Sequence, residues 1–250
     1  MLEHFKGDEV FVKKVLDYCD QALYKQRLIL TKFLNPHEID IVRKVVGQGE
    51  IKCLEYGGFV NSENKRMIIC PNFYEIEKND FEIIVVEIIY NDHFGKLLHK
   101  DILGALMNLG IERNCIGDID DKGRICFACT KQSYHYIKEH LLQIKKSKIH
   151  LKEIEEEIEI KREYVQKTFI VSSFRIDKLI SVLFGVPRSK VKSYISSGYV
   201  KVNHKEVAEV SFLCHNNDII SLRKHGRVKL VDEQRTTRQS NHVVSGYFYK

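Results

Sequence analysis

Apolar residues in the carboxy-terminal third of the chain recur at the three- and four-residue spacing of two consecutive helices. Between Phe174 and Gly185 they share one helical face, and they are Ile176, Leu179, Ile180, Leu183 and Phe184. We expect Ser172 or Ser173 to cap this helix and Gly185 to end it. Pro187 suits the first turn of a second helix, which Gly198 ends and whose apolar side consists of Val191, Tyr194 and Ile195.

The pattern then changes to the alternation of strands. From Tyr199 to Lys205 every second residue is apolar, so Lys201 and Asn203 are expected to point outward together, ahead of a polar turn. Asp218 to Arg223 predicts another strand. These elements make a unit of roughly sixty residues, which is at the lower end of what folds alone.

The amino-terminal part predicts two helices followed by strands. A helix from Asp8 to about Arg27 would bury Phe11, Val15, Cys19 and Ala22. Asn35-Pro36-His37-Glu38 is a strong helix start, with Asn35 as cap and Glu38 reaching back to it, and Gly47 follows the end. Residues 51–56 and 66–70 read as strands.

The middle part alternates as strand, helix, two strands, helix and strand. The predicted ranges are 81–90, 99–109, 115–119, 124–130, 134–144 and 149–160. This order predicts a ferredoxin-like or RRM-like sheet. The segment from Lys122 to Ala128 faintly resembles an RNA-contacting RNP1 strand, but Phe127 is its single aromatic residue, so we do not expect base stacking there.

The chain therefore predicts an α+β protein with several units. We expect a small amino-terminal domain of helices and strands over residues 1–78, an RRM-like domain over 79–165, a basic domain over 172–232 and a tail over 233–250 that orders only on a partner. The acidic stretch from Ile154 to Glu163 is expected to end the middle sheet and begin a charged connector.

Charged residues are distributed unevenly along the chain. Residues 173–250 contain fourteen Lys and Arg against six Asp and Glu, a net charge of +8, whereas the first 172 residues contain 26 against 28, a net charge of −2. Basic groups gathered in one segment are the electrostatic signature of nucleic-acid contact, because phosphates neutralised by Lys and Arg release counterions.

The residue types of a catalytic or metal site are scattered. Cys126 and Cys129 have the gap of a zinc pair, but no second pair follows, and in a strand they would face opposite sides, so we expect packed, reduced thiols. We expect no catalytic residues, metal or cofactor. No apolar run approaches the roughly twenty residues of a membrane span, and the first residues do not resemble a signal peptide, so the expected location is the cytoplasm.

Four segments carry a specific resemblance: Arg175-Ile176-Asp177-Lys178, Arg188-Ser189, the run from Gly198 to His204, and Asn217-Asp218-Ile219-Ile220. Together they resemble the S4 RNA-binding domain, with His204 at a turn position where that domain usually has Gly. The resemblance and the charge indicate one surface for structured RNA. Its expected residues are Arg175, Lys178, Arg188, Ser189, Lys190, Lys192, Lys201, Asn203 and Lys205.

With Phe33-Leu34-Asn35-Pro36 and the run from Arg113 to Ile119, the whole chain resembles the YlmH family of bacterial S4-domain proteins. The resemblance implies a monomeric, non-enzymatic factor that binds ribosomal RNA of the large subunit and tRNA in ribosome-associated quality control, while tails are added to stalled nascent chains. Two alternatives stay open: an enzyme that modifies ribosomal RNA or tRNA, with its site in the middle domain, and a protein adaptor in cell division.

Overall fold

The computed structural model describes residue 5 and residues 7–249, and the chain divides into two compact units, one ending at Lys161 and the other beginning at Arg162. Both units combine helices with antiparallel sheets, so the chain is an α+β protein as predicted. Within the described residues, no helix has the length and apolar character needed to cross a membrane.

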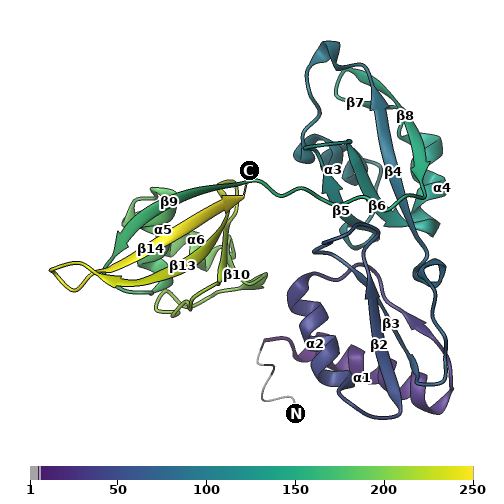
Figure 1. Ribbon diagram of the computed structural model, residues 1–250, viewed down its shortest axis with the longest axis horizontal. Helices are drawn as coiled ribbons and strands as arrows, with labels where there is room; N and C mark the ends of the chain where they lie inside the picture. The colour runs from purple at the N-terminus through teal and green to yellow at the C-terminus, as the bar shows by residue number, and fades with distance from the viewer. Residues whose placement is uncertain (1–4, 6, 250) are drawn as a thin grey trace. The chain divides into compact units, whose positions relative to one another are not determined.

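The first unit begins with two helices on a three-stranded antiparallel sheet of order β1-β3-β2 (Figure 1). The elements are α1 (Glu9–Tyr24), β1 (Ile29–Leu30), α2 (Pro36–Val46), β2 (Ile51–Tyr56) and β3 (Arg66–Pro71). The predicted start of α2 is confirmed: Asn35 Oδ1 accepts hydrogen bonds from the backbone N–H groups of His37 and Glu38, and Glu38 accepts one from the Asn35 N–H.

The rest of the first unit is the ferredoxin-like sheet that the sequence predicts. Its strands have the order β5-β6-β4-β8-β7, and two helices pack on one face. The elements are η2 (Lys78–Phe81), β4 (Ile83–Tyr90), η3 (Asp92–Phe94), α3 (His99–Asn108), η4 (Arg113–Cys115), β5 (Ile116–Asp120), β6 (Cys126–Thr130), α4 (Lys131–His140), β7 (Gln143–Ile144) and β8 (Ser147–Ile154). The helix predicted over 134–144 starts and ends earlier, because residues 143–144 pair with β8.

The second unit is a six-stranded antiparallel sheet of order β11-β10-β12-β13-β14-β9, with two helices on one face. The elements are β9 (Tyr164–Val171), α5 (Ile176–Phe184), α6 (Arg188–Ser196), β10 (Val200–Val202), β11 (Lys205–Glu206), β12 (Ile219–Leu222), β13 (Gly226–Thr236) and β14 (His242–Tyr249). Its core joins the predicted apolar stripe of α5 to Val191, Ile195, Val200 and Val202. The stop at Gly185, with a φ of +64°, is as predicted.

Two predictions for this unit are wrong. The expected flexible tail is strand β14, which pairs along its length with β13 and β9, as Figure 1 shows. Val244 and Phe248 join the core under the helices, whereas Ser245 and Tyr247 point to the opposite face of the sheet. The cap of α5 is Arg175 rather than a serine, and it makes no side-chain capping bond.

Candidate nucleic-acid interface

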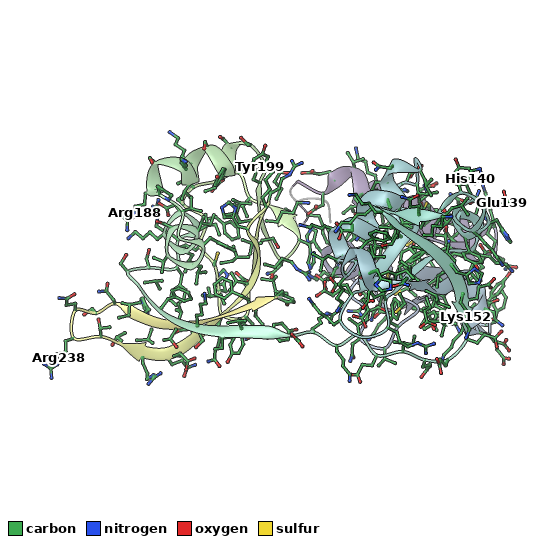
Figure 2. All side chains as sticks on the ribbon, turned by 90° about the horizontal axis from the view of Figure 1, so that it is seen from above. Glu139, His140, Lys152, Arg188, Tyr199 and Arg238 are labelled. Carbon is green, nitrogen blue, oxygen red and sulfur yellow. The ribbon has the colours of Figure 1, made fainter. Side chains whose placement is uncertain are left out.

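The helical side of the second unit holds a group of cations in the first turns of α6. Pro187 precedes the helix, and Arg188, Ser189 and Lys190 are its first three residues, with Lys192 one turn further. All four side chains are exposed because the buried side of α6 is formed by Val191 and Ile195. Figure 2 shows Arg188 on the helical side, away from Arg238 in the β13–β14 turn.

These cations lack anionic neighbours. Within the described part of the chain, Arg188, Lys190 and Lys192 make no ion pair, and the first turn of α6 contains no acidic residue. The amino-terminal end of a helix carries a partial positive charge, so cations there repel the helix dipole. Such an arrangement costs stability in the isolated protein and favours a bound polyanion.

Arg175 and Lys178 on α5 are placed differently. Arg175 Nε donates to Asp177 Oδ1 at 3.1 Å, so its guanidinium is engaged with a neighbouring carboxylate. Lys178 is half-buried on the same helix. Both residues lie on the helical side of the sheet, but Arg175 presents less of its charge to a ligand than Arg188 does.

The predicted residues of the β10–β11 hairpin do not share the helical side. Val200 and Val202 are buried under the helices, so Lys201 between them lies on the opposite face of the sheet. Lys205 begins the short edge strand β11. The single surface predicted from the sequence is therefore divided between two faces, because strand alternation separates Lys201 from the helices.

Asn203 has a structural role in this hairpin. Its amide donates to Asp218 Oδ1 at 2.7 Å and accepts the Ile219 N–H at 2.8 Å, which ties the turn to the start of β12. Asn203 and His204 both have positive φ angles, +49° and +70°. The turn thus keeps the left-handed backbone for which glycine is preferred, although His204 occupies the second position.

Sequence reasoning missed an aromatic and basic cluster beside α6. Arg223 lies with its guanidinium carbon 5.1 Å from the centre of the Tyr199 ring, and Tyr194 lies 6.0 Å from Tyr199 and 5.8 Å from His225, centre to centre. Tyr194 was expected on the apolar side of its helix, where it does pack against the core, and Arg223 was expected at the end of a strand, so neither was considered as part of a surface cluster. The sequence does place tyrosines close to basic residues in this region, and that combination is typical of cation–π contacts and of surfaces that stack RNA bases.

The middle domain does not offer the base-stacking face of an RRM. Phe127 is fully buried on the helix side of the sheet. On the opposite face, Phe33 and Phe59 from the amino-terminal part pack against Val85 and Ala128. The sheet face that RRM proteins use for RNA is therefore partly occupied by the chain itself, which agrees with the expectation that this domain stacks no bases.

The acidic stretch after β8 is more than a solvated connector. Ile158 and Ile160 pack beside Phe33 and Phe59, and the Val60 N–H donates to the Ile158 carbonyl at 2.9 Å. The glutamates pair with cations of the same unit. Glu157 pairs with Lys78 and Glu156 with Arg124, while Glu153, which lies within β8, pairs with Lys138.

The cysteine pair of β6 does not form a shared site. Cys126 joins the cluster around Phe33, whereas Cys129 lies in the core under the helices, on the other face of the strand. Burial raises the pKa of the Cys126 thiol to about 12 and raises the pKa of Cys129 further. Within the described residues, no cluster of three His, Cys, Asp or Glu could hold a metal ion.

Comparisons with known proteins cover nearly the whole chain. Residues 7–74 match the model of the YlmH N-terminal domain, residues 77–157 match a putative RNA-binding domain in YlmH, and residues 174–220 match the S4 domain. The Bacillus subtilis (strain 168) "Ribosome-associated protein quality control protein P2" is 30% identical over an alignment of 247 residues, and the match covers 97% of this chain and 96% of that protein.

A solved structure is also similar. The cell division protein ylmH from Streptococcus pneumoniae has a TM-score of 0.52 and 30% sequence identity, and the match covers 59% of this chain and 90% of that one.

Proposed function

Because the chain belongs to the YlmH family of S4-domain proteins, we propose that it is a non-enzymatic RNA-binding factor acting on the large ribosomal subunit. It contacts ribosomal RNA and peptidyl-tRNA on stalled subunits while tails are added to the nascent chains. It works as a monomer in the cytoplasm and requires no cofactor or metal. The name of the Bacillus subtilis relative supports the quality-control part of this proposal.

One observation carries the RNA-binding proposal. The first turn of α6 presents Arg188 and Lys190 at the positive end of a helix, with no acid beside them. Ser189 adds a hydroxyl donor between them. This cluster suits phosphate oxygens, since the guanidinium can donate two parallel hydrogen bonds and the ammonium adds a point charge. Lys192 extends it by one turn.

The test is cosedimentation of the full chain with purified large subunits. Arg188→Glu combined with Lys190→Glu should abolish cosedimentation, because both phosphate contacts become repulsive. The matched control is Lys13→Glu with Lys14→Glu, which makes the same change in net charge on exposed positions of α1. If the control variant cosediments like the parent chain and the α6 variant does not, binding is assigned to α6. Equal loss in both variants, or loss in neither, refutes the assignment.

A second candidate function has one observation in its favour. The similar solved structure from Streptococcus pneumoniae is named a cell division protein, which supports a role as a protein adaptor. Affinity capture with the full chain, with and without nuclease treatment, separates the two. Partners that remain after nuclease support the adaptor; partners that disappear support RNA as the link.

The enzymatic alternative makes a different prediction. An RNA-modifying enzyme would leave ribosomal RNA or tRNA without one modification in a deletion strain. Mass spectrometry of both RNA classes should find the modification pattern unchanged. A single lost modification that the restored gene returns would overturn the non-enzymatic proposal.

A further inference from the structure

The face of the six-stranded sheet opposite α5 and α6 is here called the outer face. In the described residues 162–249, α5 and α6 are the two helices, and both pack on the inner face with Val228, Leu230, Val244 and Phe248. By strand alternation, the residues between these positions point to the outer face. They include three tyrosines, namely Tyr164 on β9 and Tyr247 and Tyr249 on β14.

The strand register places these tyrosines in two rows that also contain cations. In the first row, Tyr164 on β9 pairs with Tyr249 on β14, and the Arg227 guanidinium carbon lies 4.4 Å from the centre of the Tyr249 ring. Arg227 on β13 pairs with Ser221 on β12, and Ser221 pairs with Lys201 on β10. The row thus crosses five strands, with aromatic rings at one end and cations at the other.

The second row repeats the arrangement. Gln166 on β9 pairs with Tyr247, Tyr247 pairs with Lys229 on β13, and Lys229 pairs with Ile219 on β12. Tyr247 and Tyr249 are two residues apart on one strand, so their rings rise side by side from the same face. The outer face therefore offers neighbouring aromatic rings with a basic residue beside each of them.

The rings are partly accessible. Tyr164 is 44% exposed, and its ring meets that of Tyr249 edge to face with centres 4.9 Å apart. Tyr247 is half-buried, and it belongs to none of the hydrophobic clusters of the chain's described core. Tyr164 therefore leaves much of its ring accessible to solvent, and Tyr247 leaves a smaller part of its ring accessible.

Charge on the outer face is mainly positive around the tyrosines. In the described part of the chain, neither Lys201 nor Lys229 makes an ion pair. Two acids flank the tyrosines at a distance along the sheet: Glu206 on the edge strand β11, which pairs with Lys201, and Glu233, which accepts a hydrogen bond from Ser245 near the β13–β14 hairpin. A surface that alternates rings with cations is complementary to a strand that alternates bases with phosphates.

We propose that the outer face binds unpaired nucleotides of single-stranded RNA. Bases stack on Tyr164 and Tyr247, while Lys229 and Lys201 contact the phosphates that follow the two rows. The Arg227–Tyr249 pair positions the Tyr164 ring. This site differs from the α6 cluster in face and in ligand, since the helical cations suit the backbone of folded RNA and the sheet suits bases outside a duplex.

The inference does not depend on the ribosomal proposal and can be measured without ribosomes. Fluorescence anisotropy of the full chain with a labelled twelve-nucleotide oligoadenylate, and with a twelve-base-pair RNA duplex as the second ligand, compares the two faces. Tyr164→Ala and Tyr247→Ala should each weaken oligoadenylate binding by about 10-fold or more. Duplex binding and cosedimentation with large subunits should stay at the parental level.

Conservative variants separate stacking from folding. Tyr164→Phe and Tyr247→Phe keep the rings and should retain most of the oligoadenylate affinity. The chain contains no Trp and 12 Tyr, so oligoadenylate should quench part of its tyrosine fluorescence, and that quenched part should be smaller in the Tyr164→Ala and Tyr247→Ala variants. The α6 variant should still bind oligoadenylate.

Two results would overturn the proposal. One is an alanine variant with parental melting temperature and unchanged oligoadenylate affinity. The other is equal loss in the phenylalanine and alanine variants, because that would show that the hydroxyl, and not the ring, makes the contact. Neither result would alter the α6 assignment, which rests on cosedimentation.

Discussion

Reversing the charges at the start of α6 should affect stability and RNA binding in opposite directions. Arg188 and Lys190 are the first and third residues of α6, and the first turn contains no acid. A charge in the first turn changes helix stability by about 0.3 to 1 kcal/mol, with the sign set by the dipole. Because these side chains are exposed and screened, the combined Arg188→Glu and Lys190→Glu variant should gain about 1 kcal/mol.

The binding side of the same prediction follows from counterion release. Loss of two phosphate contacts should reduce the slope of log affinity against log salt by about two and should weaken binding by about 100-fold near 0.1 M salt. Denaturant unfolding of the parent and the variant measures the first effect, and titration with large-subunit RNA at several salt concentrations measures the second.

Each outcome has a definite meaning. Higher stability together with weaker, less salt-dependent binding agrees with a functional cluster held at an energetic cost. Lower stability of the variant would mean that the two cations hold the fold, and the loss of binding would then say nothing about RNA contact. An unchanged salt slope would show that the phosphates bind elsewhere.

Three further predictions concern the first unit. Asp118 accepts hydrogen bonds from the Glu63 and Asn64 N–H groups at 2.6 and 3.1 Å. Asp118→Ala should therefore lower the unfolding free energy of the first unit by about 3 kcal/mol, as measured by urea denaturation. An unfolding free energy unchanged within error would contradict a stabilising role of Asp118. Hydrogen bonds from Arg124 lower the pKa of Glu87 below its ordinary value of 4.5, so Glu87→Gln should have a lower melting temperature than the parent at pH 7. The difference in melting temperature should vanish as the pH falls through the lowered pKa, because the parent then loses the charged pair. A difference that does not change with pH would contradict a stabilising role of the pair. Because burial raises the thiol pKa values of Cys126 and Cys129, both should react with a thiol reagent only after unfolding, and fast labelling of the folded chain would refute their burial.

The sequence predicted the parts of the fold that local patterns decide. The cap at Asn35 and the stop at Gly185 follow from backbone chemistry, and the stripe of α5 follows from helical spacing. The order of elements in the middle domain was sufficient to predict its sheet. Strand β14 was missed because the polar segment before it resembled a flexible tail, while one of its two partner strands, β9, is distant in sequence.

The structure shows how the predicted RNA-binding residues are arranged, while their role in RNA binding stays a prediction. The cations of α6 lie together, as expected from their spacing on one helix. Lys201 was assigned to the same surface, although its buried neighbours Val200 and Val202 already placed it on the other face. The aromatic rows of the outer face could not be predicted, because they depend on the register of five strands.

Mapping of crosslinks tests the central claim most directly. The full chain would be crosslinked by ultraviolet light to RNA in living cells, and both the attached peptides and the attached RNA fragments would be identified. The account predicts that peptides containing residues 188–192 carry fragments of large-subunit ribosomal RNA. Crosslinks confined to the first unit, or α6 peptides that carry no ribosomal RNA, would contradict it.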